Sequence, residues 1–213
     1  MVSSLYKVVG LLVMFVTCEV VAWTSETEMD AAVCTALAAG EKAWSPAFVS
    51  QLQETATNAS SVEMRCEASM LLSLSSWQSF LDTMDETWMG REMAYATNAV
   101  EQIGTATNTW QYWMARFVHA GAHASDCNYA RSLSILGDSI DRMAREYCTN
   151  EVTDVERALL GLFEMPDLKT VDAMRAFAGM SAAMLGDGNT ATNFAVQVPL
   201  RYRTMIFKVL DGK

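Results

Sequence analysis

Both histidines of the chain and one of its five cysteines lie within one short segment. His119 and His123 are four positions apart, and Cys127 follows after another four. On a helix, this spacing places the two imidazoles on one face, within reach of a single metal ion or haem iron. Asp126 adds a carboxylate beside them. One hypothesis is therefore an export-pathway metal- or haem-binding protein, or an enzyme, that uses His119 and His123.

Two features weaken the metal hypothesis. The residues between the histidines are Ala-Gly-Ala, so the general-base glutamate of the HExxH metalloprotease motif is absent. Arg116 shares their face, and its fixed charge opposes a cation. We therefore expect no cofactor, and we expect the face that carries Tyr112, Arg116, His119 and His123 to meet solvent.

The opposite face of the same segment is apolar. Trp110, Trp113, Met114 and Phe117 recur at helical spacing. Such a face most simply builds the core, and the functional alternative is the wall of a pocket for a small apolar ligand. The chain holds 15 methionines, whose flexible side chains suit such pockets.

Motifs typical of enzymes are absent from the sequence. It contains no GxSxG nucleophile elbow, no Walker A motif and no GxGxxG dinucleotide-binding motif. The net charge of −10 argues against nucleic acid, which is bound by clustered Lys and Arg, and against anionic membrane surfaces. We expect a binding protein, whose partner is another protein or a small apolar ligand, without catalytic activity.

The first 22 residues have the pattern of a secretory signal peptide. Lys7 precedes an apolar run over residues 8–16, and Val20 and Ala22 suit a cleavage point before Trp23. The run is short for a membrane span, which needs about 20 apolar residues. We expect a secreted or cell-surface protein with one domain over residues 23–213. The alternative is a structural protein that an uncleaved segment tethers to the membrane.

An exported chain with an even number of cysteines favours disulfides. Removal of the signal peptide leaves Cys34, Cys66, Cys127 and Cys148. Cys127 and Cys148 would lie at opposite ends of one continuous helix, too far apart to pair. If consecutive helices alternate in direction, the preferred pairs are Cys34–Cys148 and Cys66–Cys127. Asn58 begins the only N-glycosylation sequon, Asn58-Ala59-Ser60, in an expected inter-helix turn.

The sequence predicts helices almost throughout, because segments with apolar residues at helical spacing alternate with helix-capping sequences. The short connections predict an all-α antiparallel bundle stapled by two disulfides. One long helix is expected to follow a break near residues 85–87 and to end near Gly121. Residues 190–210 are expected to form a kinked or interrupted helix, because Pro199 cannot continue one.

Overall fold

Six of the helices begin after an N-cap residue with a short polar side chain. The side-chain oxygens of Ser25, Ser45 and Ser61 each accept a hydrogen bond from a backbone N–H in the first turn of the helix that follows. Asn128 and Asp187 do the same for two later helices. Another cap, Thr153, forms a full capping box with Glu156, as the sequence predicts. These polar residues satisfy donors that the first turn leaves unpaired, and this fixes where each helix begins.

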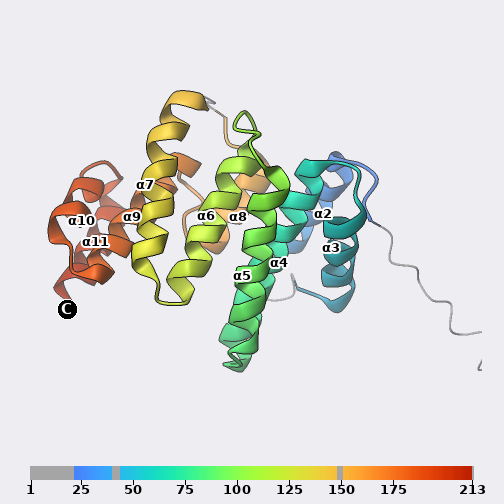
Figure 1. Ribbon diagram of the computed structural model, residues 1–213, viewed down its shortest axis with the longest axis horizontal. Coiled ribbons are helices and arrows are strands. Elements are labelled where there is room, and N and C mark those ends of the chain that lie inside the picture. The colour runs from blue at the N-terminus through green and yellow to red at the C-terminus, as the bar shows by residue number, and fades with distance from the viewer. Residues whose placement is uncertain (1–21, 40–43, 148–150, 213) are drawn as a thin grey trace, which may run out of the picture.

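The computed structural model describes residues 22–39, 44–147 and 151–212, and these residues form helices without any strand (Figure 1). The predicted all-α class is thereby confirmed. The helices are α2 (Glu26–Ala38), α3 (Pro46–Asn58), α4 (Val62–Thr83), α5 (Thr87–Ile103), α6 (Trp110–Ser125), α7 (Tyr129–Glu146), α8 (Asp154–Leu162), α9 (Thr170–Leu185), α10 (Gly188–Ala195) and α11 (Leu200–Asp211).

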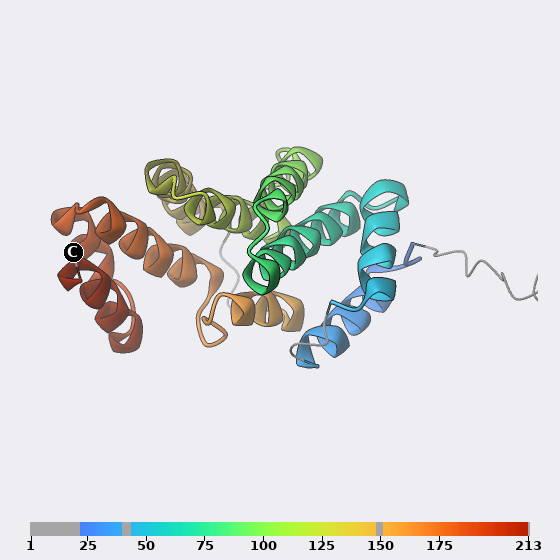
Figure 2. The same cartoon turned by 90° about the horizontal axis from the view of Figure 1, so that it is seen from below.

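The helices lie side by side in an extended array. It runs from α2 and α3 at one end, through α4, α5, α6, α7 and α9, to α10 and α11 at the other end (Figures 1 and 2). Most neighbours in space are neighbours in sequence, joined by short connections that reverse the chain. Other helices that are not consecutive in sequence also touch, such as α7 and α9, and the pair farthest apart in sequence is α2 and α8.

A break at Gly104 separates α5 from α6, where the sequence predicted one continuous helix. Gly104 has φ +58° and ψ −114°, a conformation that L side chains rarely adopt, and α6 begins only at Trp110. The prediction was wrong because an isolated glycine inside a helical pattern is often tolerated. The C-terminal prediction is confirmed: α10 and α11 are separate helices on either side of Pro199.

The break explains why the predicted Cys66–Cys127 disulfide is not formed. The Cys66 sulfur lies 3.9 Å from the carbonyl oxygen of Gln111, at the beginning of α6. Cys127 follows the end of α6, so a 16-residue helix, about 24 Å long, separates the two thiols. With one long helix, both would have lain at the same end of the array. Cys66 and Cys127 are free thiols. Cys34 has no disulfide partner among the described residues, and its predicted partner Cys148 lies outside them.

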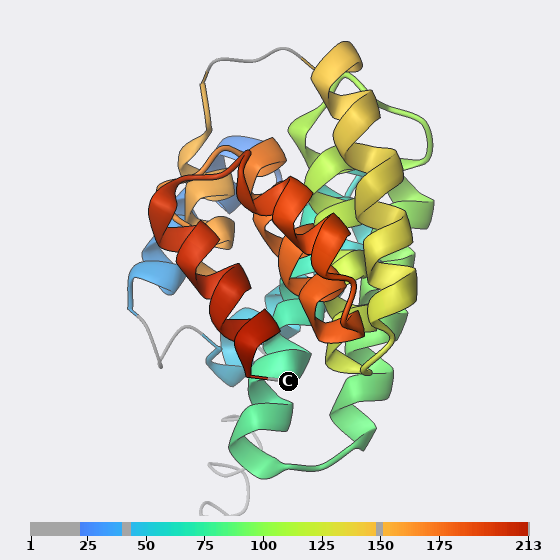
Figure 3. The same cartoon turned by 90° about the vertical axis from the view of Figure 1, so that its left-hand side faces the viewer.

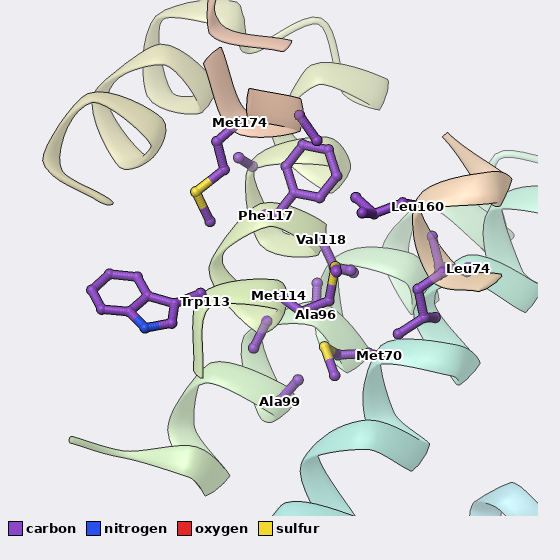
Figure 4. Close-up of a cluster of buried hydrophobic side chains, with 14 of the residues drawn as sticks. Met70, Leu74, Ala96, Ala99, Trp113, Met114, Phe117, Val118, Leu160 and Met174 are labelled. Atoms are coloured by element: carbon purple, nitrogen blue, oxygen red, sulfur yellow. The ribbon is translucent and has the colours of Figure 1, made fainter. Parts of the chain in front are cut away.

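The core is densest around α6. Trp113, Met114 and Phe117 have no exposed surface, and Figure 4 shows them among buried side chains from α4, α5 and α9. Among residues 22–39, 44–147 and 151–212, no helix is both long enough and apolar enough to cross a membrane.

Close packing of α9 on α11 depends on Gly179. A Cβ atom at this position would lie 2.6 Å from Cδ1 of Ile206 and 3.2 Å from Cβ of Phe194. We expect Gly179→Ala to lower the free energy of unfolding by about 1–3 kcal/mol, because it overpacks this contact. Urea denaturation followed by circular dichroism measures the change.

Gly137→Ala is the matched control. Gly137 also lies inside a helix, but nothing within 4 Å would meet its Cβ atom. This substitution should raise stability by about 0.5–1 kcal/mol, because alanine favours the helix. Equal effects of the two substitutions would contradict the packing argument.

Candidate functional site

The two histidines of α6 do lie together. The ring centroids of His119 and His123 are 4.8 Å apart. Burial and the charges of His123, Arg131 and Arg116 lower the pKa of His119 to about 4, and burial and Arg131 also lower the pKa of His123. No cluster of three His, Cys, Asp or Glu ligands occurs in the described part of the chain. The pair therefore sits beside arginines without the third protein ligand that metal sites commonly use.

The face of α6 that was expected to meet solvent is covered by α7. Tyr112 is only 4% exposed, and its hydroxyl accepts a hydrogen bond from Arg142 of α7. Arg116 donates from Nε to the hydroxyl of Ser139, also on α7, at 2.9 Å. The expectation was wrong for Tyr112 and Arg116, because a helical wheel shows only one helix, whereas α6 is packed on several sides. His119 and His123 are half-buried and keep part of their surface exposed.

The residues predicted to line an apolar pocket are core residues, and they lie next to a cavity instead of lining it. Trp113, Met114 and Phe117 are fully buried, and Trp110 is half-buried at the start of α6. Phe117 packs against Phe163 and Phe177, with ring centroids 4.6 Å and 5.6 Å away. These two phenylalanines line a cavity on the neighbouring face of α6.

This cavity, the Glu92 cavity, has a volume of about 340 Å³ and draws its walls from almost every central helix. Its buried inner wall is formed by Leu74, Glu92, Val118 and Gly121, and its half-buried rim by Trp77, Ala124, Ser125, Tyr129, Phe163 and Phe177. The half-buried rim shows that solvent reaches the cavity. Its size and largely aromatic and aliphatic walls are typical of small-molecule sites.

One carboxyl group, that of Glu92, lines this largely apolar cavity. Glu92 is 4% exposed, and its Oε1 atom accepts a hydrogen bond from the Ser125 hydroxyl at 3.0 Å. Within the described residues, no hydrogen bond reaches Oε2. Burial raises the pKa of Glu92 to about 7, Ser125 opposes this shift, and the charge of Asp126 adds to it. Such a group can change its charge near neutral pH.

The sequence holds a signal for Glu92 that was missed. Glu92 shares a helical stripe with Ala96, Ala99 and Ile103, all of which are buried in α5. An acidic residue in phase with a buried stripe is unusual, because burying a charge is costly.

The predicted glycosylation site is accessible at its asparagine. Asn58 is the last residue of α3 and is exposed, and its Nδ2 atom donates to Glu54 at 2.7 Å. Ser60 is exposed too, and the cap of α4 is its neighbour Ser61. A glycan on Asn58 would replace one of the two N–H groups of Nδ2 and leave the other to donate to Glu54.

Comparisons with protein-family models, with curated proteins and with solved structures found no match to this chain. The geometry of the Glu92 cavity therefore carries the functional argument.

Proposed function

We propose that this protein is an exported binding protein that takes one small apolar ligand into the Glu92 cavity. The observation that carries the proposal is the cavity itself, which is about 340 Å³ in volume and has one acidic wall group, Glu92. Four aromatic rings at the rim, from Trp77, Tyr129, Phe163 and Phe177, provide flat surfaces for a ligand.

A neutral fluorescent probe tests ligand binding. N-phenylnaphthylamine emits weakly in water and strongly in apolar surroundings. We expect saturable binding of one probe per chain, with quenching of tryptophan emission because Trp77 lies at the rim. Ala124→Trp should weaken binding by about tenfold or more, because the indole would occupy the cavity.

The control for Ala124→Trp is Ala130→Trp. Ala130 is exposed on α7 and does not line the Glu92 cavity. This variant should bind the probe as the wild type does. Probe binding that survives Ala124→Trp unchanged would place the probe elsewhere and would contradict the proposal.

Export is the second part of the proposal, and it rests on the sequence of residues 1–22. The predicted boundary falls just before Trp23, which is 9% exposed and packs edge-on against Phe48 at 5.8 Å. A chain that begins there keeps this core residue. N-terminal sequencing of the product should read from Trp23, whereas an intact residue 1 would favour the tethered alternative. In the oxidised product, peptide mapping should join Cys34 to Cys148.

A protein partner is the second candidate function, favoured by the turn between α4 and α5. This hairpin tip, residues 81–88, projects beyond the rest of the array (Figures 1 and 3). Leu81 is 47% and Met84 70% exposed at the tip. Failure of any apolar probe to bind would favour this surface over the Glu92 cavity.

A further inference from the structure

The wall chemistry of the Glu92 cavity restricts which ligands suit it. None of its ten lining residues is basic, and Glu92 is the only one that carries a carboxyl group. A ligand carboxylate or phosphate would therefore meet a second negative charge and no compensating cation. A purely apolar ligand would cover Glu92 and leave Oε2 without a partner, which costs free energy.

The charges outside the cavity reinforce this preference. Asp126 follows Ser125 at the end of α6 and acts electrostatically on Glu92. Asp126 also lines an adjacent groove of about 550 Å³, together with Glu86, Met89 and Met93. Two carboxylates, Glu86 and Asp126, therefore lie on this groove and attract cations.

We propose that the ligand of the Glu92 cavity is a hydrophobic amine, whose apolar body fills the cavity and whose protonated nitrogen pairs with the Glu92 carboxylate. The inference rests on the proposed ligand-binding function and specifies its chemistry. Ser125 holds Oε1 through its hydroxyl, which leaves Oε2 to accept from the ammonium group. The aromatic rim adds favourable contacts, because a cation near a ring face is attracted to it.

Two compounds with the same apolar body make the test sharp. Naphthylethylamine and naphthylethanol differ only in the group that would meet Glu92. Each is titrated at pH 8 against the bound N-phenylnaphthylamine probe, and loss of probe fluorescence gives its affinity. We expect the amine to bind about 10–100-fold more tightly than the alcohol, because a charge-assisted hydrogen bond contributes about 1.5–3 kcal/mol.

Glu92→Gln removes the charge and keeps the shape of the side chain. In this variant the amine should lose its advantage over the alcohol. Glu92→Asp draws the carboxylate back and should give an intermediate advantage, and it replaces the glutamine variant if that variant does not fold. Glu101→Gln is the control, because Glu101 is exposed on the same helix.

The outcomes separate the two proposals. Equal affinity of amine and alcohol for the wild type, or an advantage that survives Glu92→Gln, overturns the amine inference and leaves the cavity as an apolar site. Failure of the probe to bind the wild type overturns the ligand-binding function itself, and the amine inference with it.

Discussion

Glu67→Gln should raise the melting temperature of this protein by about 5 °C at pH 8 and by much less near pH 5. Glu67 is 2% exposed on α4, and its Oε1 atom has no hydrogen-bond partner. Burial, with the charges of Asp30 and Glu26 on α2, raises the pKa of its carboxyl group well above the ordinary value. An unpaired buried polar group costs about 1–3 kcal/mol, and an ionised one costs more.

The pH dependence follows from the direction of the shift. Above pH 4.5 an unfolded chain releases the Glu67 proton, while the folded chain retains it, so the folded state binds more protons. Stability therefore falls as the pH rises towards the raised pKa of Glu67. The pKa of Glu92 is also raised, to about 7, and it adds a loss of the same sign between about pH 4.5 and 7. Glu67→Gln removes the loss of stability that comes from Glu67 and leaves the loss that comes from Glu92.

Thermal melts by circular dichroism across pH 5–8 measure this effect. Glu101→Gln again serves as the control, because Glu101 is exposed and its replacement should leave the pH profile unchanged. Parallel profiles for the wild type and Glu67→Gln would show that Glu67 does not titrate as a buried acid.

Trp113→Ala should cost about 4 kcal/mol of unfolding free energy, the largest loss expected for a single truncation. Trp113 has no exposed surface, packs edge-on against Tyr112 at 4.7 Å, and donates from Nε1 to the Thr107 carbonyl at 3.0 Å. Truncation leaves a cavity and an unpaired carbonyl acceptor, and Trp→Ala changes in cores cost about 3–5 kcal/mol. Since domains are stable by only about 5–15 kcal/mol, the variant should unfold at much lower urea.

Two comparisons sharpen this experiment. Trp113→Phe retains a ring and loses the hydrogen bond, so its cost should be clearly smaller. Trp88→Ala removes a half-buried tryptophan near the hairpin tip, where Arg91 stacks on its ring at 4.5 Å, and should cost less than about 1 kcal/mol. Urea denaturation followed by far-ultraviolet circular dichroism avoids dependence on the deleted fluorophore. A loss at Trp113 no larger than at Trp88 would contradict its central place in the core.

Local signals predicted the helices well, because capping and periodicity are properties of neighbouring residues. Thr153 and Glu156 are an example: their spacing alone predicts the capping box that the structure contains. Gly104 is the opposite case, because the same residue type lies inside α9 as Gly179 without ending the helix. Its effect depends on the contacts that each helix makes elsewhere, which the local sequence does not specify.

The candidate site was harder to predict because it joins residues from six segments. Glu92, Val118 and Phe177 come from three different helices, and only the packing of α5, α6 and α9 brings them to one cavity. The sequence correctly drew attention to α6, but assigned the pocket to the side that forms the core. A single-helix pattern cannot show which neighbour leaves a gap.

The contact between α2 and α8 affects how the chain is synthesised. The first residue of α8 is made roughly 120 residues after the last residue of α2. At about 5–20 residues per second, the interval is roughly 6–24 s. During it Met29 and Val33, which are buried in the finished fold, lack their main partner helix. The nascent chain therefore exposes the apolar side chains of α2 to chaperones or to a translocation channel until roughly three-quarters of the chain has been made.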